Sequence, residues 1–143
     1  MAMRARAPGA RPVIAALLPG HRLTFESNEP PGAPDVFFAN LRPADGIAAP
    51  GALYAIETIE LAALDAYEDV ARRVYERINV RVTRADGRRE EAIVYRMPVR
   101  EHRVRAGLPS RTQLVQIRAG YADWGLDLRV LAAALESASA SIA

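Results

Sequence analysis

Apolar and polar residues alternate through the first two thirds of this chain, a period typical of β-strands with one buried face. We predict strands at residues 11–17, 22–26, 36–41, 51–56, 74–84 and 90–96. Turn residues separate them: Pro19-Gly20, a proline-rich loop at 27–35, Asp45-Gly46, and Ala85-Asp86-Gly87 with hairpin chemistry. Turns rather than crossover helices join most of the strands, which favours antiparallel pairing.

A helical period replaces the alternation at residues 58–68 and again in the last third, at 110–124 and 127–137. Ser110 and Gln113 have the spacing of a capping box, and Gly125 suits the end of that helix. A further helix is expected to end at residues 3–7, before Pro8-Gly9. The pattern predicts one α+β domain over residues 1–143, with a small curled, mainly antiparallel sheet or barrel and helices packed outside.

Glu68 lies on the apolar side of the predicted helix 58–68, because Leu64 and Leu61 precede it by four and seven residues. A carboxyl held against leucines is partly removed from water, which raises its pKa towards the range of a general acid or base. The negative end of the helix dipole acts in the same direction. The alternative is a structural salt bridge with Arg72 or Arg73.

The composition excludes several classes of site and protein. The 143 residues are 50% apolar and 25% charged, as in a single globular domain, and the lack of cysteine excludes disulfides and thiol nucleophiles. His21 and His102 have no second ligand at metal spacing, so we do not expect a metal site. With no bilayer-length apolar run and no secretory signal, we expect a cytoplasmic protein without a membrane partner.

Positive charge is concentrated in one segment. Every basic residue is arginine, which together with the abundant alanine indicates a GC-rich bacterial genome, and residues 72–105 hold eleven arginines against five acids. Residues 96–105 raise the question of nucleic acid, but no aromatic residues interleave and no known module is present, so we do not expect such a partner. The segment is interpreted as a solvated loop, or as a pocket mouth that attracts a carboxylate.

Short motifs along the chain occur in the order found in a known family. They are Leu18-Pro19-Gly20-His21-Arg22-Leu23-Thr24-Phe25, Ala39-Asn40-Leu41-Arg42-Pro43, Gly51-Ala52-Leu53-Tyr54, Leu64-Asp65-Ala66-Tyr67-Glu68, then Tyr75, Tyr95, Pro109-Ser110 and Gly125-Leu126. Over about 120 residues, the scale of a whole domain, the chain resembles the γ-glutamylcyclotransferase family. Leu64 to Glu68 is similar to its L-D-x-x-E signature.

The resemblance implies an enzyme that cyclises a γ-glutamyl amine or amide to 5-oxoproline and releases the amine, with Glu68 at the catalytic acid position and no cofactor. Asn40, Tyr54, Tyr95 and Gln113 are the candidate substrate-binding residues. Each also has a structural interpretation: Asn40 bonding its own backbone, the tyrosines as core residues, and Gln113 as a helix cap in place of the tyrosine of many relatives.

The chain departs from the family at two further places. Family enzymes begin with a strand ending in Tyr-Gly-Ser-Asn, whose backbone N–H groups hold the glutamyl end, and this motif and its strand are absent. Either the start codon is assigned too far downstream or the element is lost, which would expose a sheet edge and favour self-pairing. Asp69 stands where relatives usually have glycine. The alternative function is therefore a catalytically silent member that binds a small molecule or a protein.

Overall fold

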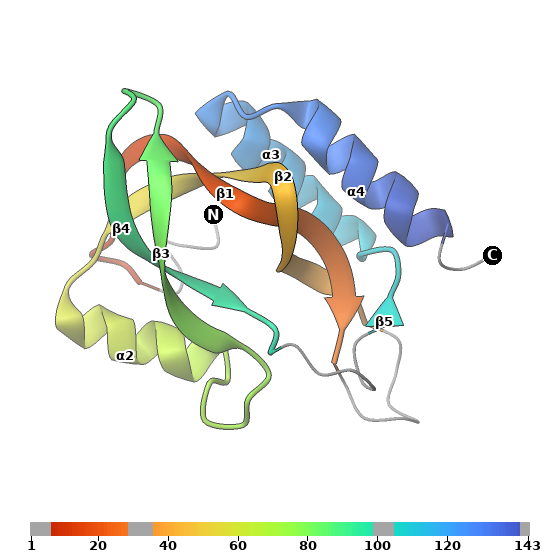
Figure 1. The fold of residues 1–143 in the computed structure, drawn as a ribbon. Helices are drawn as coiled ribbons and strands as arrows, with labels where there is room; N and C mark the ends of the chain where they lie inside the picture. Colours follow the sequence, from red (N-terminus) through yellow and green to blue (C-terminus); the bar gives the residue numbers. More distant parts are fainter. Residues whose placement is uncertain (1–6, 29–35, 99–104, 141–143) are drawn as a thin grey trace.

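The computed structural model describes residues 7–28, 36–98 and 105–140 (Figure 1). The sheet pairs its strands antiparallel in the order β2-β1-β3-β4, and a short β5 also pairs with β1. The elements, in chain order, are β1 (Arg11–Ser27), β2 (Phe38–Ala55), α2 (Thr58–Tyr67), β3 (Glu76–Arg84), β4 (Arg89–Arg96), β5 (Arg105–Ala106), α3 (Arg111–Trp124) and α4 (Leu128–Ala140). The fold is thus α+β with a mainly antiparallel sheet, as the sequence predicts.

Two predicted turns are wrong, because the chain bends there without reversing. Pro19-Gly20 lies inside β1 and Asp45-Gly46 lies inside β2, so the shorter strands predicted on either side merge into two long ones. In the register of the two strands, Pro19 pairs with Ala48 and His21 pairs with Pro43. The single residue Gly20 therefore lies opposite the four residues 44–47, which form a bulge. Gly20 and Gly46 have φ values of 71° and 75°, a region that favours glycine. This irregularity bends both strands and contributes to the curl of the sheet.

The β3–β4 hairpin is where it was predicted. Val80 is level with Ala92 and Ile78 with Val94, and the turn contains Gly87 at a φ of 87°. Asp86 Oδ1 accepts a hydrogen bond from the backbone N–H of Arg88 at 3.1 Å, as expected for an aspartate in a tight turn. The helix expected at residues 3–7 lies almost wholly outside the described residues, as does His102.

The sheet is curled but not closed, so it is not a barrel. Within the described part of the chain, no hydrogen-bonded ladder joins β2 to β4, the two ends of the strand order. Helices α3 and α4 lie side by side against β1 and β2, whereas α2 lies apart from them near β3 and β4 (Figure 1). No helix in the described ranges is long and apolar enough to cross a bilayer.

Two apolar clusters fix the helices. Phe25 of β1 packs with Tyr121 of α3 and Leu131 of α4. Leu64 of α2 packs with Ala7 and Ala10, with Tyr54 and Tyr95 of the sheet against them. The second cluster positions the end of α2, and therefore Glu68, beside the edges of β2 and β4 that do not pair with each other.

Candidate active site

A cavity of about 1050 Å³ lies between the end of β2, the strand β4, and helices α2 and α3. Its volume is on the scale of small-molecule sites, roughly 300–1,000 Å³. The residues that line it and matter here are Tyr54, Leu61, Leu64, Glu68, Glu90, Glu91, Ile93, Tyr95, Val115, Asp123 and Trp124. Strands β2 and β4 both contribute to the wall, so the cavity borders the place where the sheet does not close.

Glu68 lies on the wall of this cavity together with Leu61 and Leu64. It is the C-terminal cap of α2, where its backbone N–H still donates to Leu64 O at 2.9 Å. The last hydrogen-bonded turn of the helix therefore fixes its backbone, and the helical spacing brings its side chain to the same face as the leucines. This is the arrangement that the sequence pattern indicates for a half-buried acid.

The residues after Glu68 form an unusual turn. Asp69 has a φ of 55°, in the left-handed region that favours glycine. Its Oδ2 accepts from Arg72 Nη1 at 2.9 Å, so Arg72 offsets the charge of Asp69. Arg72 is one of the two arginines considered as structural partners of Glu68, and it makes this hydrogen bond to the neighbouring acid.

Two aromatic side chains form part of the wall. Tyr54 of β2 and Trp124 of α3 contact each other edge to face, with ring centroids 5.8 Å apart. Both line the cavity, so Trp124 belongs to the site. Its place could not be read from the sequence because the contact joins a strand to a helix seventy residues later.

Tyr95 of β4 also lines the cavity, and two charged residues fix its hydroxyl. Tyr95 Oη donates to Asp65 Oδ1 at 2.6 Å, and Arg77 Nη1 donates to Asp65 Oδ2 at 3.0 Å. Burial raises the pKa of Tyr95 well above its ordinary value, and the hydrogen bond to Asp65 and the negative charges of Asp65 and Glu68 act in the same direction. The phenol is therefore protonated at physiological pH.

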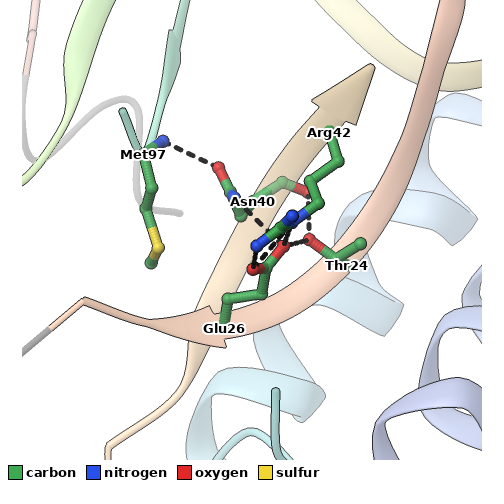
Figure 2. Close-up of polar contacts among 5 residues, drawn as sticks. All are labelled: Thr24, Glu26, Asn40, Arg42 and Met97. Carbon is green, nitrogen blue, oxygen red and sulfur yellow. Dashed lines mark hydrogen bonds and ion pairs between the residues drawn. The ribbon is translucent and has the colours of Figure 1, made fainter. Parts of the chain in front are cut away.

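Asn40 does not line the cavity. It is 4% exposed, and its side chain bridges two other groups, accepting from Met97 N at 2.7 Å and donating to Glu26 Oε1 at 3.3 Å (Figure 2). These contacts reach distant parts of the chain and are not the hydrogen bonds to its own backbone expected of a local turn. The reason is that Asn40 lies within the long strand β2, where it reaches the chain after β4.

The carboxylate that Asn40 contacts is the centre of a buried polar cluster (Figure 2). Glu26 is 3% exposed, and it accepts from Arg42 Nε at 2.8 Å and Nη2 at 2.6 Å, from Asn40, and from the hydroxyl of Thr24. Burial favours the neutral acid, but the hydrogen bonds and charge of Arg42, with those of Thr24 and Asn40, outweigh it and lower the pKa of Glu26.

This lowered pKa predicts a loss of stability in acid. Because Glu26 binds a proton more weakly in the folded than in the unfolded chain, its contribution is complete above its ordinary pKa of 4.5 and is lost as the pH falls through the lower folded value. We expect the free energy of unfolding, measured with urea between pH 7 and pH 3, to fall more steeply in the wild type than in Glu26→Gln. Equal slopes would contradict the assignment.

Gln113 also lies away from the cavity lining. Its backbone N–H donates to Ser110 Oγ at 3.2 Å, which is half of the predicted capping box. The reciprocal half is not formed, because Gln113 Oε1 is buried with no hydrogen-bond partner in the described part of the chain. Gly125 ends α3 in the left-handed conformation, as predicted.

The charges on the cavity wall are negative. Among the described lining residues Glu68, Glu90, Glu91 and Asp123 are acids, and none is basic. Arg84 holds Glu90 at 2.8 Å, whereas Glu91 is 4.0 Å from Arg81. Such a wall attracts ammonium groups. No cluster of three or more potential metal ligands was found in the ranges that the structure describes.

Comparison with known proteins decides the family. The model of the AIG2-like family matches residues 50–126, a segment that runs from the end of β2 through α2, β3, β4 and α3. The chain belongs to the AIG2-like family. The match contains Glu68 and nearly all of the cavity wall.

Solved structures share the fold of this AIG2-like chain. A γ-glutamyl cyclotransferase superposes with a TM-score of 0.77 at 22% identity, over 99% of this chain and 79% of that one. A human protein described as uncharacterized gives 0.75 at 23% identity, over 99% and 78%. YkqA of Bacillus subtilis gives 0.66 at 24% identity, over 84% and 41%. They confirm the γ-glutamylcyclotransferase-like fold that the sequence predicts. No curated protein gave a significant match.

Proposed function

We propose that this AIG2-like protein is a γ-glutamylcyclotransferase-type enzyme, which converts a γ-glutamyl amine or amide to 5-oxoproline and releases the amine. The observation that carries the proposal is the position of Glu68, a half-buried acid on the apolar wall of a cavity large enough for a small molecule. The family and the shared fold support it, since the chemistry suits one carboxyl group placed in this way.

In the proposed reaction the substrate attacks itself. Glu68 takes a proton from the substrate's α-ammonium group, and the freed amine forms a bond to the γ-carbonyl carbon. The ring nitrogen of the tetrahedral intermediate then loses its second proton to solvent. The intermediate expels the amine partner, which takes the proton from Glu68 as the carbon–nitrogen bond breaks. Five-membered ring closure needs little more than correct positioning, because both reacting groups belong to one molecule.

The remaining wall suits such a substrate. Tyr54 and Trp124 offer apolar surface for the methylene groups, and the acidic side chains attract the ammonium group. Glu68 is then both the proton acceptor and the group that places the ammonium in the cavity.

The proposal is tested by incubating the protein with a panel of γ-glutamyl amides, and measuring 5-oxoproline and the released amine by mass spectrometry. We expect the two products to form in equal amounts from at least one amide of the panel. Binding of these amides without product would instead identify a binding protein with the same fold. Folded protein that neither binds nor turns over any of them would overturn the proposal.

A further inference from the structure

The hydroxyl proton of Tyr95 has a defined direction. The carboxylate of Asp65 can only accept, so at 2.6 Å the proton of Tyr95 lies between the two oxygens. It points to Asp65, which is not among the described residues that line the cavity. Arg77 donates to the other oxygen of Asp65 and holds that carboxylate in place. The three side chains come from β4, α2 and β3, so their alignment depends on the folded structure.

This direction determines what Tyr95 offers to a ligand. Its only proton is used by Asp65, so the lone pairs that remain on its oxygen are acceptors. Tyr95 and Glu68 line the same cavity, and Glu68 lies close enough for its charge to act on the phenol. The cavity wall near Glu68 therefore has a second hydrogen-bond acceptor, the hydroxyl oxygen of Tyr95, which carries no charge.

We propose that Asp65 is a positioning residue, which keeps Tyr95 as a hydrogen-bond acceptor for the α-amino group of the substrate beside Glu68. The inference rests on the proposed function. An ammonium group has three N–H donors. With one N–H held by Tyr95 and another given to Glu68, the lone pair that forms is restricted in direction and can be turned towards the γ-carbonyl carbon.

Replacing Asp65 with asparagine should reverse the polarity of this arrangement. Arg77 is only a donor, so the amide oxygen of the new side chain must face Arg77 and its NH₂ group must face Tyr95. Tyr95 then accepts from position 65, and its own proton turns to the cavity. A residue with only a packing role would tolerate this nearly isosteric change.

The experiment compares γ-glutamyl methylamide with its des-amino analogue, N-methylglutaramate, which lacks the α-amine and cannot cyclise. We expect Tyr95→Phe and Asp65→Asn each to lower kcat/KM for the amide by about tenfold, the scale of a lost hydrogen bond to a charged group. The inhibition constant of the analogue should change by less than about twofold, because it makes no such bond. Asp45→Asn, the same chemical change at an exposed position outside the cavity lining, is the matched control.

The double variant Tyr95→Phe/Asp65→Asn should be no worse than Tyr95→Phe alone, because Asp65 acts through the tyrosine oxygen. Equal losses for amide and analogue, or a full effect of Asp65→Asn when it is added to Tyr95→Phe, would overturn the inference. If Asp65→Asn does not fold, the Tyr95→Phe variant is sufficient for the test. The inference is refuted if Tyr95→Phe leaves the ratio between kcat/KM for the amide and the affinity for the des-amino analogue unchanged. If the wild type releases no 5-oxoproline, the proposed function fails, and calorimetric affinities for both probes test the inference separately.

Discussion

Glu68→Gln should lower the rate of 5-oxoproline release by about 100- to 10,000-fold, the usual contribution of a positioned general acid or base. Glutamine keeps the shape of the side chain and can still hydrogen-bond at the cavity wall, but it cannot carry a proton between the two amines. The measurement is the initial rate with saturating γ-glutamyl amide, alongside substrate affinity and thermal unfolding. We expect most of the loss in kcat. A smaller rise in KM should accompany it, because one of the acids that attract the ammonium group is neutralised while the rest of the wall is unchanged.

The matched control is the adjacent acid. Asp69→Asn makes the same chemical change one residue later, where the carboxylate pairs with Arg72, and asparagine tolerates the positive φ of this position. Asp69 is absent from the described cavity lining, so its variant should retain activity within about threefold, a loss well below that of a general acid or base. A Glu68→Gln protein as active as the wild type would remove Glu68 from the mechanism.

Arg42→Met should cause the largest loss of stability. It removes the charged donors to Glu26. The carboxylate, 3% exposed, then keeps Thr24 and Asn40 as its hydrogen-bond donors among the residues that the structure describes. Breaking a buried ion pair costs about 3–5 kcal/mol, and the lower end is appropriate because Arg42 is itself 37% exposed. Urea unfolding at pH 7 measures this loss.

Two further measurements separate the unpaired charge from lost packing. Glu26→Leu combined with Arg42→Met replaces the pair by apolar groups and should recover most of the lost free energy. The Arg42→Met protein should also approach the wild type as the pH falls, because a buried carboxyl without its partner has a raised pKa and becomes neutral. Stability of the single variant within about 1 kcal/mol of wild type would show that this pair is worth no more than an exposed one.

The sequence is sufficient to predict those features that depend on residues close together along the chain. Helix α2 places Glu68 beside Leu64 through hydrogen bonds spanning four residues, and the Asp86-Gly87 turn sets the β3–β4 register. Ser110 and Gly125 likewise mark the ends of α3. These features depend on local spacing and turn chemistry, which a single sequence contains.

The sequence is insufficient to predict a residue's role when the residue that it contacts lies far along the chain. Gly20 at positive φ is compatible with either a reversal or a bend, and only its pairing opposite residues 44–47 distinguishes them. Asn40 reaches Met97, fifty-seven residues later, and Asp65 reaches Tyr95, thirty residues later. Nothing in the local pattern around either residue indicates these contacts, so the sequence singles out neither Asp65 nor the buried contacts of Asn40.

The gap between β2 and β4 has a consequence for how this site can diversify. Paired strands are fixed about 4.8 Å apart by their ladder, but no such ladder in the described part of the chain sets the distance across this seam. Side chains such as Ile93 of β4 and Val115 of α3 line the cavity beside this seam instead. Under the proposed function, exchanging one of them would change the size of the leaving amine that fits, while every backbone hydrogen bond stays intact. The scaffold could then acquire new amine partners one residue at a time.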